Sequence, residues 1–275
     1  MCVPVVCCSF VYVCWVGEGC LLGKDEYTDY CKRFFMLWEY LKSCSKNQNG
    51  VVRDICMLRK YSVERMGEVL KKADFQYIDM SKVDLERVRK YGDDLALFSE
   101  EGYFLMTGRY VFPVKDMLGN VVALIGWYPD EKKYVTTPSK LFSKDGLFYG
   151  MEQLGESGLG SNYIITEGIF DSLSARSLGI KCVAQMGITS SRYKEVLYTL
   201  FKQIVAIPDI DEQGRDVLQY DKWKLPRNGK YFRWSNPKYY MKDLDKFINS
   251  YEEEDVREVL RAVFSENQRI VTLKL

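Results

Sequence analysis

The chain of 275 residues contains no histidine. This absence excludes a serine–histidine–aspartate triad, a histidine general base and every zinc site that needs an imidazole ligand. Any chemistry must therefore use carboxylates, amines, hydroxyls, thiols or a bound metal. The 47% hydrophobic and 14% aromatic content is nevertheless that of a globular protein with a sizeable core, not of a disordered chain.

An excess of charge of one sign is also missing. The 39 basic and 38 acidic residues leave a formal net charge of +1. A surface that binds nucleic acid would therefore have to come from local clustering of basic side chains. The charge of the whole chain indicates no class of partner.

A hydrophobic run of membrane-spanning length is missing as well. The stretch VPVVCCSFVYVCWV, residues 3–16, is too short to span a bilayer comfortably and has no basic segment before it, so we expect no signal peptide and no membrane partner. Five of the nine cysteines lie in the first twenty residues, without the paired C-x-x-C spacing of a zinc ribbon. We expect reduced, buried thiols in a cytoplasmic protein.

Residues 3–16 alternate partially and are expected to form a buried strand or hairpin, and hydrophobic residues at helical spacing follow after residue 23. Residues 24–46 are expected to form a helix that the segment NQNG ends. Residues 62–73 are expected to form a second helix with Ser62 as its N-cap, and residues 81–92 a third.

The hydrophobic period changes to two from residue 103. Residues 103–137 are expected to form an antiparallel meander, and the glycine-rich residues 154–161 a linker. Strands and helices then alternate, which predicts a parallel sheet with helices on both faces. The expected strands are residues 162–166, 181–187, 203–208 and 229–235, and the expected helices are residues 170–179, 190–201, 214–224 and 243–264.

Acidic residues follow two of the expected strands directly. Glu167 follows YIIT, and Asp209 and Asp211 follow IVAIP. Because ligands of parallel sheets bind at the carboxyl ends of the strands, both sets are expected at the same edge. Asp171 lies four residues beyond Glu167, on the first turn of the next helix, and can face the same edge.

A third acidic pair, Asp243 and Asp245 in MKDLDKF, follows the strand GKYFRWS. Six carboxylates at one edge cannot all stay ionised without a cation, and oxygen ligands without histidine or cysteine select Mg²⁺ or Mn²⁺ over zinc. Each motif alone is more often a solvated loop or a helix cap. The three in order, on the expected elements, indicate a metal site.

The stretches TEGIFDSLSA, PDIDEQGRD and KDLDKF resemble the Toprim domain that bacterial-type (DnaG-like) primases share with topoisomerases and some nucleases. In that family a glutamate–glycine turn, a D-x-D pair and a later acidic pair bind catalytic divalent metal. The resemblance implies a Toprim parallel-sheet domain that holds two or more Mg²⁺ or Mn²⁺ ions. It assigns metal binding to Glu167, Asp171, Asp209, Asp211, Asp243 and Asp245, and catalysis to Glu167, Asp209 and Asp211.

Residues 108–150 resemble the basic subdomain of DnaG-like primases, which topoisomerases and Toprim nucleases lack. The matching residues are Arg109, Phe112, Pro113, Lys133, Tyr134, Pro138, Phe142, Lys144, Tyr149 and Gly150. The resemblance implies that phosphates are bound by basic residues and that bases stack on Tyr134 and Trp127. The nucleotide- and nucleic-acid-binding residues it implies are Arg109, Lys133, Tyr134 and Lys144.

The two resemblances together imply a DNA primase catalytic core with an α/β and α+β fold. Such an enzyme is a DNA-directed RNA polymerase that makes short RNA primers on single-stranded DNA from ribonucleoside triphosphates, by metal-dependent nucleotidyl transfer. The implied organisation is a helical, cysteine-rich N-terminal region, a mixed α+β basic subdomain, the Toprim domain and a helical tail, at residues 1–100, 101–160, 161–250 and 251–275.

The chain departs from the family pattern in three places. Trp127 stands where the family usually has arginine, which puts nucleotide affinity in doubt. The zinc ribbon and the helicase-binding domain of the family are not matched either. Template selection and helicase docking are then expected from a separate zinc-ribbon protein and a replicative helicase, as for a phage-encoded core in the bacterial cytoplasm.

Two other functions use the same motifs. A Toprim-family nuclease would admit water in place of a ribose hydroxyl, and residues 108–150 argue against it. A non-catalytic, primase-derived module would bind nucleotides or nucleic acid, and the crowding of like charges argues against that.

Overall fold

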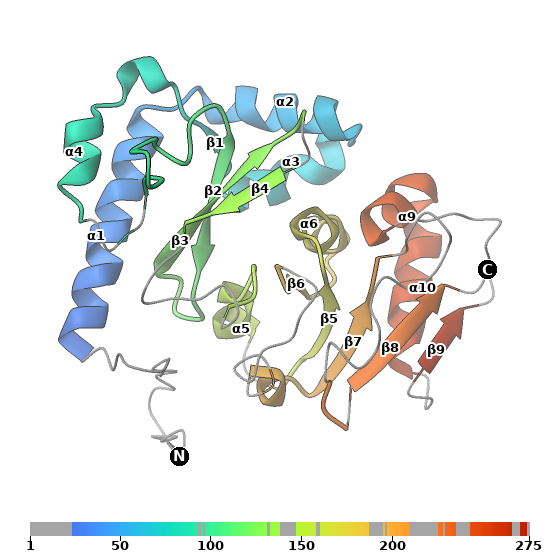
Figure 1. The fold of residues 1–275 in the computed structure, drawn as a ribbon. Coiled ribbons are helices and arrows are strands. Elements are labelled where there is room, and N and C mark those ends of the chain that lie inside the picture. Colours follow the sequence, from blue (N-terminus) through green and yellow to red (C-terminus); the bar gives the residue numbers. More distant parts are fainter. Residues whose placement is uncertain are drawn as a thin grey trace.

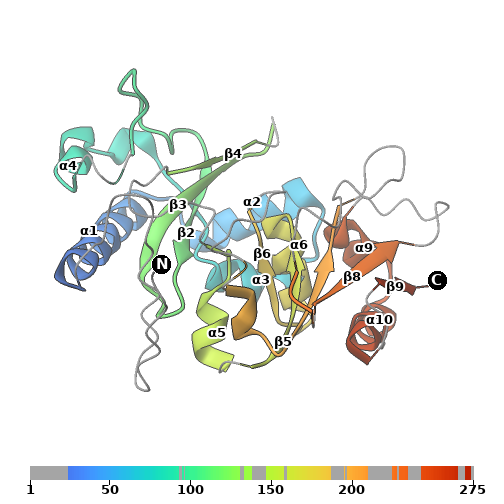
Figure 2. The same cartoon turned by 60° about the horizontal axis from the view of Figure 1, so that its bottom comes forward.

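The computed structural model is built around two β-sheets, with helix α6 (Ile169–Ser177) between them (Figure 1 and Figure 2). The structure describes residues 24–92, 95, 97–130, 133–137, 147–157, 160–186, 195, 197–209, 225–227, 229–234, 243–265 and 270–273. The cysteine-rich residues 1–23, the expected helix at 214–224 and half of that at 190–201 lie outside these described residues.

The N-terminal part is helical, as the hydrophobic spacing predicts. Its elements are α1 (Lys24–Ser43), α2 (Gln48–Arg59), α3 (Val63–Lys72), the 3₁₀ turn η1 (Met80–Lys82) and α4 (Leu85–Arg89). The predicted apolar stripe of α1 is fully buried and consists of Tyr30, Phe34, Leu37, Trp38 and Leu41. The predicted N-cap of α3 is also confirmed, because the Ser62 side chain accepts a hydrogen bond from Arg65 N at 3.4 Å.

Helix α2 is not among the predicted helices. The predicted first helix does end before NQNG, at Ser43, but the same segment also starts the next helix. Asn47 is the N-cap of α2, and its side chain accepts a hydrogen bond from Asn49 N at 2.9 Å. The helix forms despite Gly50 because its apolar face is buried, and tertiary packing outweighs local propensity. The buried residues of that face are Val51, Val52, Ile55 and Cys56. The helix expected at residues 81–92 is also shorter, because Asp84 caps α4 within it.

The smaller sheet is the predicted antiparallel meander. Its order is β1-β2-β3-β4, from β1 (Gln76–Tyr77), β2 (Tyr110–Lys115), β3 (Val121–Tyr128) and β4 (Lys133–Thr136). The short strand β1, which the sequence pattern did not predict, joins the edge of β2 through the pairs Gln76–Val111 and Tyr77–Tyr110. In β4, Tyr134 pairs with Trp127 of β3, so the meander places these two aromatic residues on adjacent strands.

The larger sheet is parallel throughout, which confirms the prediction from strand–helix alternation. Its order is β6-β5-β7-β8-β9, from β5 (Asn162–Thr166), β6 (Cys182–Ala184), β7 (Gln203–Ile207), β8 (Gly229–Trp234) and β9 (Ile270–Leu273). Strand β9 follows the expected C-terminal helical segment and was not among the predicted strands. The predicted linker at residues 154–161 is also wrong in part, because α5 (Glu152–Ser157) overlaps it and Leu154 is buried.

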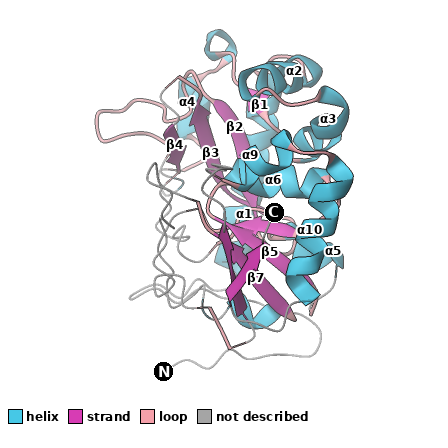
Figure 3. Ribbon diagram, turned by 90° about the vertical axis from the view of Figure 1, so that its right-hand side faces the viewer, coloured by secondary structure: helices cyan, strands magenta, loops and turns pink. Residues whose placement is uncertain are grey.

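The two faces of the parallel sheet belong to different cores. Ile164, Val205 and Phe232 pack with α9 (Leu244–Ser250), α10 (Glu253–Ser265) and the end of α6, helices that lie on one side of the sheet (Figure 3). Tyr163 and Ile165 point to the opposite face, as the period of two requires, into a core shared with the N-terminal helices and the antiparallel sheet. This second core is continuous between the parallel and the antiparallel sheet, so it holds the two sheets in a fixed arrangement.

None of the helices in the described part of the chain combines the length and the apolarity needed to cross a membrane.

Candidate functional site

The predicted acidic residues that the structure describes leave the parallel sheet at its carboxyl edge. Strands β5 and β7 pair with Thr166 opposite Ile207, so Glu167 and Asp209 follow the same edge. Asp243 is the N-cap of α9, and its side chain accepts a hydrogen bond from Lys246 N at 2.7 Å. We refer to Glu167, Asp171, Asp209, Asp243 and Asp245 as the acidic edge. Asp211 lies outside the described residues.

Asp171 lies at the centre of the acidic edge. It is 6% exposed, on the first turn of α6. Its pKa is raised well above the ordinary value, first because the carboxyl group is buried and then because Asp209, Asp243 and Asp245 carry like charge nearby. The structure therefore brings Asp209, Asp243 and Asp245 within electrostatic reach of one buried carboxyl group, as the sequence predicts.

The turn between β5 and α6 requires glycine. A Cβ at Gly168 would collide with Oδ2 of Asp171. Asp171 has little room to move away, because its Oδ1 accepts a hydrogen bond from Asp245 N at 2.8 Å. Gly168 thus permits the close approach of the backbone to a buried carboxylate.

Glu167 is held differently from the other carboxylates. Burial raises its pKa. Within the part of the chain that the structure describes, its Oε2 is buried and has no hydrogen-bond partner. A buried polar atom without a partner destabilises the fold unless another group satisfies it, so this oxygen is suited to a ligand.

Asp245 is surrounded by donors from three helices. Its Oδ2 accepts from Arg59 Nη2 of α2 at 2.5 Å. Its Oδ1 accepts from Ser174 Oγ of α6 and from Asn249 Nδ2 of α9, the latter at 2.9 Å. Both oxygens of this nearly buried carboxylate therefore already have protein partners.

Arg59 is the charged residue at this edge that the sequence did not indicate. Its guanidinium lies over the Phe170 ring, 4.4 Å from the ring centre, and donates to the Tyr61 hydroxyl at 3.2 Å. It is 186 positions from Asp245 in the sequence and lies on α2, which was not predicted. No local pattern could have identified it.

The residues predicted to bind nucleotide or nucleic acid lie in different surroundings. Tyr134 of β4 is 43% exposed. Its pKa is raised, first by burial of the hydroxyl, and the charge of Arg59 opposes this rise. The nearby carboxylates of Asp171, Asp245 and Asp209 raise the pKa further, which places the hydroxyl close to the acidic edge. Lys133 is exposed beside it. Lys144 lies outside the described residues.

Arg109 lies at the start of β2, next to the antiparallel sheet. Its Nε donates to Leu105 O at 3.1 Å, and its guanidinium is 5.7 Å from the centre of the Tyr128 ring. A Cβ at Gly126 would lie 2.6 Å from Arg109 Cδ, so this glycine makes room for the arginine. No described contact joins Arg109 to the acidic edge, and its predicted role in binding stays a prediction.

The acidic edge fits a divalent cation by its chemistry. The side chains that meet there offer only oxygen ligands, their charges crowd Asp171, and Glu167 Oε2 lacks a protein partner among the described residues. No group of three or more carboxylates or thiols in the described ranges is arranged closely enough to hold a metal ion. The metal-ligand prediction is therefore supported by the like charges around Asp171 and by the unpartnered Oε2 of Glu167.

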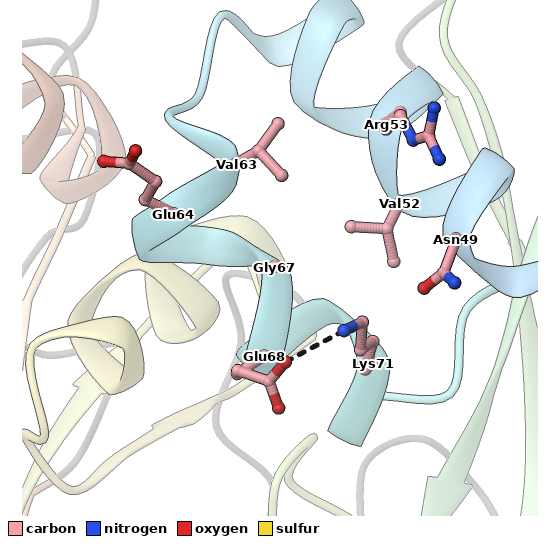
Figure 4. Close-up of a pocket in the computed structure, with 8 residues that line it drawn as sticks. All are labelled: Asn49, Val52, Arg53, Val63, Glu64, Gly67, Glu68 and Lys71. Carbon is pink, nitrogen blue, oxygen red and sulfur yellow. Dashed lines mark hydrogen bonds and ion pairs between the residues drawn. The ribbon is translucent and has the colours of Figure 1, made fainter.

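A pocket of about 320 Å³ lies elsewhere, between α2 and α3 (Figure 4). Its lining residues are Asn49, Val52, Arg53, Val63, Glu64, Gly67, Glu68 and Lys71. None of them belongs to the acidic edge or to the predicted nucleotide-binding set.

Residues 164–248 match the protein-family model described as Toprim-like. The chain is 17% identical to the solved structure of a DnaG primase catalytic domain bound to single-stranded DNA, with a TM-score of 0.67 over 87% of this chain and 80% of that one. The chain carries a Toprim-like domain within a DnaG-type catalytic-core fold. The Toprim-like match includes every residue of the acidic edge and Asp211.

Curated relatives agree with this fold. A protein named DNA primase from Thermotoga maritima is 27% identical over 222 residues, which cover 72% of this chain. Another of that name, from Deinococcus radiodurans, is 33% identical over 120 residues, or 41% of this chain. The matches span 39% of the first relative and 21% of the second, so the chain covers less than half the length of either.

Trp127, where DnaG-like proteins usually have arginine, does not take the base-stacking role predicted for it. It is only 3% exposed, and its ring meets Phe170 edge to face at a centroid distance of 4.8 Å. Phe170 precedes Asp171 on α6, so Trp127 packs the antiparallel sheet of this Toprim-containing fold against the helix that carries the acidic edge. The prediction that bases stack on Trp127 is wrong because its ring is buried in the hydrophobic core.

Proposed function

We propose that the chain is a DNA primase catalytic core that synthesises short RNA primers on single-stranded DNA from ribonucleoside triphosphates. The observation that carries the proposal is the acidic edge, in which Asp209, Asp243 and Asp245 raise the pKa of the buried Asp171 within a fold shared with DnaG catalytic domains. The named relatives and the single-stranded DNA in the similar solved structure support this choice of reaction and template.

We propose Glu167, Asp171, Asp209, Asp211 and Asp243 as the residues that hold two or more Mg²⁺ or Mn²⁺ ions. Oxygen ligands alone favour these hard cations. Bound divalent cations would lower the pKa of the primer 3′-hydroxyl and neutralise the triphosphate. Glu167, Asp209 and Asp211 are the proposed catalytic residues among them. The role of Asp245, which was predicted with this set, is taken up below.

The other residues of the proposed site bind and orient the substrates. Tyr134 offers an exposed aromatic ring beside the acidic edge, on which a base can stack. Lys133 and Lys144 are proposed to bind phosphates as mobile point charges, and Arg109 through its planar guanidinium. This division of labour requires no protein nucleophile, which agrees with the absence of histidine.

Other features of the prediction remain proposals of the same kind. They are the boundaries at residues 100, 160 and 250, the cytoplasmic location, the phage origin, and the partnership with a replicative helicase or a separate zinc-ribbon protein.

The decisive experiment incubates the protein with single-stranded DNA, four ribonucleotides and Mg²⁺ or Mn²⁺. Short RNA products are expected, and Asp209→Ala and Asp211→Ala should each reduce them about 100-fold or more, since metal-assisted charge stabilisation contributes several kcal/mol. Asp130→Ala, in the turn before β4, serves as a control for loss of an acidic residue. Cleavage of labelled DNA without nucleotide incorporation would instead identify a nuclease. Binding without either reaction would identify a non-catalytic module.

A further inference from the structure

Asp245 differs from the rest of the acidic edge because protein donors satisfy both of its oxygens. Arg59 occupies Oδ2, and Ser174 and Asn249 occupy Oδ1. The Asp245 side chain is 9% exposed and that of Arg59 is 27% exposed, so the pair is largely shielded from water. These donors take three of the roughly four lone-pair positions of the carboxylate, so a cation bound at Oδ2 would lie against the positively charged Arg59 guanidinium.

Arg59 is itself held in place by contacts on two sides. The guanidinium lies on Phe170, which directly precedes Asp171 on α6, and it donates to Tyr61 just beyond the end of α2. The Tyr61 and Phe170 rings also contact each other, with centroids 6.3 Å apart. An arginine stacked on one aromatic ring and hydrogen-bonded to another has few alternative rotamers.

Asp245 in turn determines the position of Asp171. The amide N of Asp245 donates to Asp171 Oδ1 at 2.8 Å, so a shift at the start of α9 moves or releases that oxygen. The chain of contacts runs from Arg59 through Asp245 to Asp171. It connects the N-terminal helix α2 to the centre of the acidic edge.

We propose that Arg59 and Asp245 form a positioning pair: Asp245 binds Arg59 in place of a metal ion, and the pair orients Asp171 from the N-terminal helices. This inference rests on the proposed function only in that Asp171 belongs to a metal site. It separates Asp245 from the acidic residues around it, whose motif alone suggests that all are ligands. It also gives the N-terminal helix α2 a role in shaping a site at the edge of the parallel sheet.

The first test is a stability cycle on the full chain in EDTA, where no metal contributes. Arg59→Met and Asp245→Asn each break the pair and are expected to lower the thermal midpoint by about 5 °C or more, because each leaves a partly buried charge unpaired. The double variant should lose clearly less than the sum of the two, since neither charge remains. Arg59→Lys, which keeps the positive charge, should lose less than Arg59→Met. Additive losses would overturn the pair.

The second test is calorimetric titration with Mn²⁺. Because the pair acts on the metal through Asp171, Arg59→Met and Asp245→Asn are each expected to weaken Mn²⁺ binding by about 10–100-fold, as loss of an outer-shell partner does. The double variant Arg59→Met/Asp245→Asn, which leaves the net charge unchanged, should weaken it no further than either single variant. Glu167→Gln is the matched carboxylate-to-amide control, and the larger loss is expected for it. A ligand freed from its arginine would bind Mn²⁺ at least as well as before, so an Arg59→Met variant that binds like the wild type while Asp245→Asn binds more weakly would show that Asp245 is a ligand and overturn the proposal.

The two tests separate this inference from the proposed function. Failure of the wild type to bind Mn²⁺ or to make primers would count against the proposed function, and the stability cycle would still decide the pair. Additive stability losses in a protein that makes primers would refute the pair alone.

Discussion

The turn after β5 and the N-terminus of α9 both place carboxylates at the same edge of the parallel sheet, but they surround them differently. In the turn, Glu167 Oε2 is buried without a hydrogen-bond partner in the described part of the chain. At α9, Asp245 accepts hydrogen bonds from Arg59, Ser174 and Asn249. The two regions are joined by the bond from Asp245 N to Asp171.

The number of hydrogen-bond donors around each buried carboxylate decides whether that carboxylate stabilises or destabilises the fold. A buried charge satisfied by several donors becomes destabilising only when a donor is removed. A buried carboxylate without a partner opposes folding and is retained where a ligand or a reaction uses it. Neutralising the Glu167 carboxylate and removing a donor to Asp245 are therefore expected to change stability in opposite directions.

Filling the turn should have the largest effect. Gly168→Ala places a methyl group against Asp171 Oδ2, and Asp171 is fixed by Asp245, so we expect a loss of about 1–3 kcal/mol in the free energy of unfolding. Urea unfolding in EDTA measures it. Gly50→Ala in α2 is the control: no atom lies within 4 Å of the added methyl, and a gain of about 0.5–1 kcal/mol is expected there. Equal responses at the two glycines would remove the case for a crowded turn.

Removing a donor from the α9 region should have the next largest effect. Ser174→Ala deletes a buried hydroxyl that donates to Asp245, and we expect a loss of about 1–2 kcal/mol in the free energy of unfolding. Ser177→Ala on the same helix removes a hydroxyl that donates only to the Ser174 carbonyl at 2.7 Å, and should change stability by less than about 0.5 kcal/mol. A Ser174→Ala variant as stable as the wild type would mean that the hydrogen bond from Ser174 to Asp245 does not stabilise the fold.

The acidic turn was predictable because its signal is local. An apolar run of strand length followed at once by an acidic residue fixes both the element and the edge where the side chain leaves it, as at Glu167 after β5 and Asp209 after β7. The parallel pairing of β5 with β6 and β7 follows from the alternation of strands and helices along the chain. Strand β9 could not be predicted from alternation, because what identifies it as a strand is its pairing with β8.

The α9 region could not be predicted in the same way, because its partners come from distant elements. The segment NQNG has the composition of a stop signal, yet Asn47 starts α2 and so brings Arg59 to Asp245. The glycine-rich residues 154–161 have the composition of a linker, yet burial of Leu154 supports α5. The sequence pattern is compatible with bases stacking on Trp127, yet its ring packs against Phe170. In each case tertiary packing decided between two uses of the same residues.

Neutralising Glu167 should have the smallest effect and the opposite sign. Burial raises the pKa of Glu167 above its ordinary value of 4.5, so as the pH rises above 4.5 the folded protein retains this proton longer than the unfolded chain does. The stability that this proton confers is present at low pH and is lost as the pH rises from 4.5 through the raised value. Glu167→Gln abolishes that loss, so in EDTA the variant should gain stability over the wild type as the pH rises above 4.5. Urea unfolding across this range measures the difference, with Glu64→Gln on α3 as the control for removing a negative charge. A difference between Glu167→Gln and wild type that does not change with pH would mean that Glu167 is satisfied in the free protein, and the contrast with Asp245 would disappear.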